Sequence, residues 1–394
     1  MKNERGIALV ITLLVVALLT IIVVEFTYSV QVDAHMTRNA LNALQASLLA
    51  RSGINLGEAA LLHDDDDQMD AYSEDWGNAD QLNSQLILPE NMLLRVQIID
   101  ESGKLNINLT RPRSVNDWRM GQTPQNPSAQ SQSQPAFKRW TTALGNLLEG
   151  RGASPQIGDA ISQYWDQLFQ TLAGSGTPGQ PGSVPTPNRT PASQGATPTP
   201  GMNNPSLWDF PSLDDASVIP ELTPSLVRRS RAVLTALDAL MTRVNVNTAP
   251  QEVLSAIIPD AGVVENIISQ RQDHGIAQRD LPALLAGASQ PGQAPLNLQT
   301  LLGTTSSYFL IRASATVNPN PITGKGGISR SASMLVRRAK RLCVPPRNPP
   351  TAPCWTLTQL DWQKEGGAAL LQQRTDQLPG ADGLPNSGLP GMGG

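Results

Sequence analysis

The chain has 394 residues, which is enough for two or three domains of ordinary size. Its 32 glycines and 32 prolines predict several linker segments that do not pack into a core. A formal net charge of −4 argues against a nucleic-acid-binding protein, because such proteins usually present a basic face. The sequence contains no nucleophile elbow, zinc-protease motif or phosphate-binding glycine loop, so we expect no enzyme.

The N-terminus reads MKNERGIALVITLLVVALLTIIVVEF, in which a short charged head precedes an apolar run over 7–24. A helix of this length measures about 27 Å, close to the ~30 Å hydrocarbon core of a bilayer. The basic residues precede the run, so the positive-inside rule places the head in the cytoplasm and the body outside it. The run is longer than the core of a secretory signal, and no small-x-small cleavage site follows it. Two alternatives remain: an uncut anchor, or a prepilin-type leader over 1–6 that is cut between Gly6 and Ile7.

The next segment, 26–62, contains no proline and predicts an amphipathic helix that continues the membrane helix of 7–25. The alternative is a break near Gly53 or Gly57. We expect the apolar face of this helix to pack against a globular head; that face comprises Ala40, Leu41, Leu44, Leu48 and Leu49. The acidic run HDDDDQMD over 63–70 lacks the ligand spacing and the glycine of a calcium loop. It predicts a solvated helix end or loop.

Two β-hairpins are predicted far apart in the sequence. In the first, NMLLRVQIID and KLNINLT alternate apolar and polar residues around a turn that contains Gly103. The second joins 306–317 to 327–338. Because neither hairpin is stable alone, we expect one antiparallel sheet that covers the long helix, with the head formed by 63–110 and 304–340.

The chain between the hairpins, 111–303, is predicted to be a helical insertion. Its apolar residues recur at three-and-four spacing, and Thr248 with Gln251 forms a capping box at the start of one helix. Spacers over 121–135 and 173–205 have compositions typical of disorder. The C-terminal segment 341–394 ends in a Gly/Pro tail and contains Cys343 and Cys354, which can form a disulfide if the body lies outside the cytoplasm.

Several segments together resemble the K-type minor pseudopilins of type II secretion systems. These are RGIALVITLLVVALL, IIDESGKLNIN, RVNVNTAPQEVLSAIIPD, SSYFLIRASATV and a strand that ends in MLVRR. The resemblance implies an α+β, pilin-like fold whose long N-terminal helix packs on an antiparallel sheet, with a large all-helical, SAM-like insertion between the hairpins. It also implies that a prepilin peptidase cuts after Gly6 and methylates Ile7.

Most pseudopilins carry a glutamate at the fifth mature position, which here is Ile11. A carboxylate in a membrane costs about 2.5–3.5 kcal/mol unless it is paired. A subunit at the tip has no subunit ahead of it to pair with, and K-type proteins resemble this chain in lacking that charge.

K-type proteins commonly bind calcium through an acidic stretch in the insertion. At the corresponding place only Asp166 remains, with Asp209, Asp214 and Asp215 as the other carboxylate candidates. We therefore expect no cofactor, with calcium at these four aspartates as the alternative.

The resemblance implies a role at the tip of a periplasmic pseudopilus. It implies assembly with I-type and J-type minor pseudopilins and the major pseudopilin, and contact with the secretin, secreted substrates and the inner membrane. The competing interpretation is a membrane-anchored DNA-uptake protein, since VNVNTAPQEVLSAIIPDAGVVENIISQRQ also resembles helix-hairpin-helix modules. The hairpin reads Pro259-Asp260-Ala261-Gly262, which places a carboxylate where phosphate would bind, so we expect no nucleic-acid partner.

Overall fold

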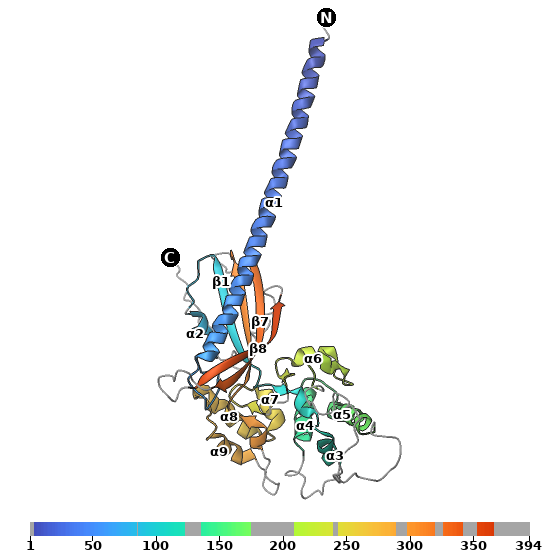
Figure 1. Cartoon of the computed structure of the whole chain (residues 1–394), viewed down its shortest axis with the longest axis vertical. Coiled ribbons are helices and arrows are strands. Elements are labelled where there is room, and N and C mark those ends of the chain that lie inside the picture. Colours follow the sequence, from blue (N-terminus) through green and yellow to red (C-terminus); the bar gives the residue numbers. More distant parts are fainter. Residues whose placement is uncertain are drawn as a thin grey trace, which may run out of the picture.

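The fold consists of a long helix, a sheet that packs against its C-terminal end, and a helical lobe beyond the sheet (Figure 1). The computed structural model describes residues 4–84, 86–122, 135–174, 209–238, 243–288, 298–319, 326–341 and 353–365. The predicted spacers fall mainly on 123–134 and 175–208, outside the described residues, as does the Gly/Pro tail after 365. The α+β class predicted from the sequence is confirmed.

Helix α1 (Glu4–Leu62) is one continuous helix of 59 residues, so the predicted rod is confirmed and the alternative break is wrong. Gly53 and Gly57 lie on the face that touches strand β6 (Tyr308–Val317). A Cβ atom on Gly57 would lie 2.5 Å from Cγ2 of Ile311, and one on Gly53 would lie 2.8 Å from Cβ of Ala313. The two glycines therefore allow close approach of helix and sheet.

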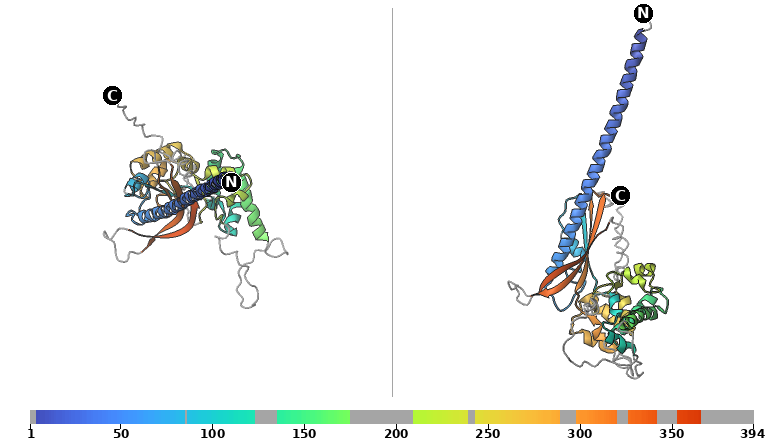
Figure 2. Two further views of the ribbon diagram at one scale, coloured as in Figure 1. Left: turned by 90° about the horizontal axis from the view of Figure 1, so that it is seen from above. Right: turned by 45° about the vertical axis from the view of Figure 1, so that its right-hand side comes forward.

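The sheet has the order β1-β6-β7-β8 and is antiparallel throughout. Its further strands are β1 (Met92–Asp100), β7 (Ile328–Arg341) and β8 (Cys354–Glu365). The predicted second hairpin is confirmed as β6 and β7. Strand β8 was not predicted and comes from the C-terminal segment. The three views agree that α1 crosses one face of this sheet (Figure 2).

The first predicted hairpin is wrong. Strand β1 pairs with β6, about two hundred residues later, while β2 (Leu105–Asn106) pairs in parallel with β3 (Leu234–Thr235). A 3₁₀ helix η1 (Ile107–Thr110) follows β2. The alternating residues Leu105, Ile107 and Leu109 are buried in the core of the insertion, so their periodicity reflects burial there.

The insertion holds its own hydrophobic core, separate from the core between α1 and the sheet. It also contains a second short parallel pair, β4 (Val244–Asn245) with β5 (Leu302–Gly303), so it is mainly but not wholly helical. Its helices are α3 (Val115–Gln122), α4 (Ala136–Glu149), α5 (Ile157–Gly174), η4 (Asp215–Val218), α6 (Pro224–Ser230), α7 (Gln251–Ile257), α8 (Ala261–Asp273), α9 (Leu281–Leu285), η5 (Ala286–Ala288) and η6 (Leu298–Thr300).

A buried polar junction connects the insertion to the sheet. Asp100, at the end of β1, accepts hydrogen bonds from the Thr248 hydroxyl at 2.5 Å, the Ser306 hydroxyl at 2.5 Å and the Asn245 amide at 3.1 Å. The predicted capping box is therefore wrong: α7 follows Pro250, and the Thr248 side chain contacts Asp100 instead of the helix. A buried carboxyl group needs such donors because it has lost its water.

The short helix α2 (Ala79–Ser84) lies against the edge strand β1. Its Asn83 amide donates to the Val96 carbonyl at 2.8 Å and accepts from the Val96 N–H at 2.8 Å. One side chain thus pairs with the backbone at the middle of that edge.

Candidate functional site

The N-terminal part of α1 is exposed along its described length. Within the described residues, α1 is the one helix that is long and apolar enough to cross a membrane, and none of its most apolar window is buried against the protein. Ile11 is 57% exposed on this segment. Gly6 and Ile7 lie within the helix, but their side chains are outside the described set, so cleavage and methylation there stay predictions.

The part of α1 over 40–62 has two faces of different character. Small residues and two larger aliphatic ones face the sheet; they are Ala46, Ala50, Gly53, Ile54, Gly57 and Leu61. Leu41, Leu44 and Leu48, which we call the outer stripe, are 55%, 56% and 58% exposed. The expectation that these leucines pack against the head is therefore wrong. The close glycine contacts select the small face for the sheet, and the outer stripe keeps the i, i+3, i+7 spacing of a helix-packing surface.

Residues 63–78, which we call the strap, connect α1 to α2 and contain the acidic run. The run is not a solvated loop as predicted, because two of its carboxylates are buried against Arg338 of β7. Arg338 Nη1 lies 2.6 Å from Asp64 Oδ2, and its Nη2 is paired with Asp70. The guanidinium also lies 4.8 Å from the ring centre of Phe309 and 4.2 Å from that of Trp355. The part of the run that faces solvent includes Asp67, which pairs with Lys340.

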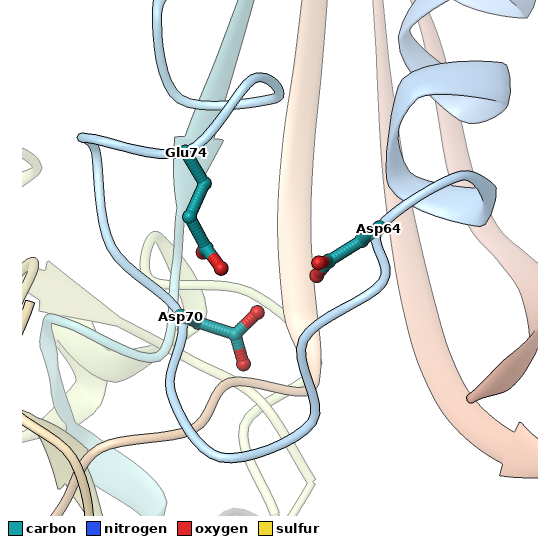
Figure 3. A group of neighbouring side chains, drawn as sticks. All are labelled: Asp64, Asp70 and Glu74. Atoms are coloured by element: carbon teal, nitrogen blue, oxygen red, sulfur yellow. The ribbon is translucent and has the colours of Figure 1, made fainter. Parts of the chain in front are cut away.

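Glu74 brings a third carboxyl group to this point (Figure 3). Oxygen atoms of Asp64, Asp70 and Glu74 lie within 4.8 Å of one another. Glu74 Oε2 accepts from the Ala71 N–H at 2.8 Å and from Trp76 Nε1 at 2.9 Å. Burial, reinforced by the charges of Asp64 and Asp70, raises the pKa of Glu74 to about 8. Burial also raises the pKa of Asp70 to about 7, although Arg338 opposes the shift.

Among the described residues, this is the one group of three or more potential ligands whose atoms lie that close together. Calcium requires six to eight oxygen ligands, and a guanidinium already pairs with two of these three carboxylates. The arrangement is therefore suited to holding protons and an arginine.

The four calcium candidates of the insertion have separate partners. Asp166 accepts from Trp118 Nε1 at 2.7 Å, and Asp209 forms a buried ion pair with Arg111 at 2.8 Å. Asp214 pairs with Arg231 at 2.6 Å, and Asp215 accepts from the Ser212 hydroxyl at 2.7 Å. The structure does not bring these four carboxylates together into one group. The expectation of no cofactor, with calcium as the alternative, stays untested.

The structure also describes Asp260 of the predicted hairpin and Cys354 of the predicted disulfide. Asp260 caps α8 by accepting from the Val263 N–H at 3.1 Å, so its carboxylate occupies the helix end where the DNA-binding interpretation needs a phosphate. Cys354 opens β8 and is buried, and no free cysteine occurs among the described residues. Cys343 lies outside them, so the Cys343–Cys354 pairing stays a prediction.

Sequence comparison shows which known proteins this chain is similar to. The family model described as "Type II secretion system (T2SS), protein K" matches residues 244–305. The type II secretion system protein K of Pseudomonas aeruginosa is 28% identical over 330 residues, an alignment that covers 79% of this chain and 84% of that protein. The chain is therefore similar to protein K of type II secretion systems, over 79% of its length in the alignment with the Pseudomonas protein.

A solved structure, the GspK-GspI-GspJ complex from the type 2 secretion system of enterotoxigenic Escherichia coli, also resembles this chain. It covers 84% of this chain and 100% of the solved chain at 15% identity, with a TM-score of 0.48. A TM-score below 0.5 does not establish a shared fold, so the similarity to protein K rests on the two sequence matches. The segment matched by the family model includes Asn245 and Thr248, which bind Asp100 in the polar junction.

Proposed function

We propose that this chain is a protein K-type minor pseudopilin and the tip subunit of the pseudopilus, where it initiates assembly and supports protein export across the outer membrane. The observation that carries the proposal is the architecture of α1: an exposed apolar segment continues without a break into a segment that carries a large head. A helix of this kind can pack beside other helices of the same kind while the head remains at the end of the filament. The role is structural and requires no catalytic group.

The proposal includes a defined membrane path. The N-terminus lies in the cytoplasm, the segment 7–25 crosses the inner membrane once, and the body lies in the periplasm. A prepilin peptidase cuts between Gly6 and Ile7 and methylates the new N-terminus, which frees the helix to leave the membrane. Ile11, which carries no charge, suits a subunit with no neighbour ahead of it.

Processing is tested by mass spectrometry of the chain co-expressed with its prepilin peptidase. We expect a methylated mature form that begins at Ile7, and we expect Gly6→Leu to remain full-length and to block secretion. A wild-type chain that retains Met1 in secreting cells contradicts the proposal.

The partners proposed are the I-type and J-type minor pseudopilins, which bind the outer stripe. Leu44→Asp places a charge in the middle of that stripe without touching the core, because Leu44 is exposed. We expect this variant to keep its thermal stability and to lose co-purification with the two partners. Gln45→Asp, at the neighbouring exposed position, is the matched control and should still co-purify. Equal co-purification of both variants would exclude the outer stripe as the contact.

A further inference from the structure

We propose that the strap is a pH-sensitive latch, which stays closed on the sheet while its carboxyl groups share protons and loosens when alkaline pH ionises them. This inference concerns how α1 is held to the rest of the molecule and does not depend on the proposed role at the tip.

The strap fastens several parts of the chain at once. The Asp70 N–H donates to the Thr304 carbonyl at 2.7 Å, and the Ser306 N–H donates to Asp70 Oδ2 at 2.6 Å. Trp355 Nε1 of β8 donates to the Asp64 carbonyl at 2.8 Å. Because the strap follows directly from α1, these bonds fix the C-terminal end of that helix to the sheet and to the segment that enters β6.

The charges inside the closed strap do not balance when all of its carboxyl groups are ionised. Asp64, Asp70 and Glu74 converge within 4.8 Å, and Asp100, fully enclosed, acts on Asp70 from β1. Against these four carboxyl groups, Arg338 is the one cation among the described residues that forms ion pairs with members of the group. Four negative charges and one positive charge in a dry site repel one another strongly. Protons relieve that excess, so the closed strap retains protons that an open strap releases to water.

The other ionisable groups around the strap do not supply the missing positive charge. Lys340 of β7 pairs with Asp67 at the exposed rim, and Arg271 of α8 donates to the carbonyls of Val246 and Ala249. Among the described residues, none of the remaining groups nearby forms an ion pair with the four carboxyl groups. These groups are Glu58 of α1, which accepts from Gln359, His63 at the end of α1, Asp66 within the run, Tyr72 within the strap, and the Glu101–Lys104 pair after β1.

The direction of the pH effect follows from the raised values. The pKa of Asp70 is raised to about 7 and that of Glu74 to about 8, both above the ordinary values of carboxyl groups. A carboxyl group with a raised pKa in the folded state stabilises that state most at low pH, and the contribution is lost as the pH rises through the folded value. The latch is therefore held most firmly in acidic medium. It weakens as the pH rises above the ordinary carboxyl pKa of about 4, and this stabilisation is lost once the pH passes the raised values of about 7 and about 8.

Hydrogen exchange of the full-length chain in detergent micelles measures the latch directly. We expect the protection factors of amides in 64–77 to fall at least about tenfold between pH 6 and pH 8.5, since one pKa unit corresponds to a tenfold change in protonation. Amides of α4, in the core of the insertion, serve as the internal reference and should keep their protection.

Glu74→Gln is the decisive variant. A glutamine carbonyl oxygen can accept from the Ala71 N–H and Trp76 Nε1 as the carboxyl oxygen does, while the side chain can no longer ionise. We expect this variant to match the wild type at pH 6 and to be more strongly protected than the wild type at pH 8.5. Glu90→Gln, at an exposed position in the loop before β1, is the matched control and should follow the wild type.

Two results overturn the latch. One is wild-type strap protection that is equal at both pH values, which needs no variant. The other is a strap that loosens with pH to the same extent in Glu74→Gln as in the wild type. If Glu74→Gln does not fold, the wild-type profile alone decides.

Discussion

Replacing Gly57 by alanine tests whether the close approach of α1 and β6 defines the head. Alanine normally stabilises a helix interior by about 1 kcal/mol relative to glycine. Here its Cβ atom would lie 2.5 Å from Cγ2 of Ile311. Ile311 is fully buried and β-branched. It is paired with Ile98 of β1 on one side and with Met334 of β7 on the other, so its Cγ2 methyl group cannot rotate away.

Overpacking of this kind costs about 1–3 kcal/mol, which exceeds the gain in helix propensity. We expect a net loss of about 1 kcal/mol in the free energy of unfolding, together with displacement of α1 from the sheet. Gly158→Ala in α5 is the matched control, because the nearest atom to its new Cβ is 3.9 Å away. This second substitution should be neutral or stabilising by up to about 1 kcal/mol.

Thermal unfolding of the full-length chain in detergent, followed by circular dichroism, compares the two variants. The expected difference of about 1–2 kcal/mol corresponds to a separation of about 2–8 °C between their midpoints. If Gly57→Ala raises the midpoint as Gly158→Ala does, the contact between α1 and β6 is looser than described and the reasoning is refuted.

Two further substitutions test the strap and the α7–α8 hairpin. Arg338→Met leaves Asp64 and Asp70 buried without their cation, so we expect the free energy of unfolding to fall by about 3–5 kcal/mol at neutral pH and by less at pH 5. Thermal unfolding at the two pH values measures this, and an equal loss at both would argue against the ion pairs. Asp260→Ala removes the cap of α8 and should lower the free energy of unfolding by about 0.5–2 kcal/mol, whereas Asp260→Asn should retain most of the stability. Urea titration distinguishes the two variants, and an equal loss in both would exclude capping as the cause.

The elements that the sequence predicted correctly are those whose pattern is long and local. Helix α1 is periodic and free of proline over its whole length, and β6 and β7 alternate on both sides of a glycine-rich loop. In each case the hydrogen-bond partners lie nearby in the sequence, within one helix or in the next strand, so the pattern alone was sufficient.

The errors arose where a pattern shows burial but not the partner. The residues of 105–109 alternate because they enter the core of the insertion, and only the fold shows that β1 pairs with β6 instead. Strand β8 carried a usable signal, since Trp355 and Leu357 alternate with threonines, but its partner β7 had already been assigned to a hairpin with β6.

The acidic run was misread for a related reason. Contiguous carboxylates usually remain in water because they repel one another, and a buried partner is invisible when it lies nearly three hundred residues away. Arg338 occurs in a strand that otherwise reads as an exposed basic end, MLVRRAKR. Its burial between Phe309 and Trp355 depends on the β8 strand that the sequence analysis did not find.

The Asn83 contact with Val96 has a consequence for the proposed pseudopilus. A strand edge whose backbone is already engaged at its centre offers a poor template for a neighbour's strand. In such a filament, neighbouring subunits would touch through their long helices while this side of each sheet stays separate, so disassembly would not require a shared sheet to be broken.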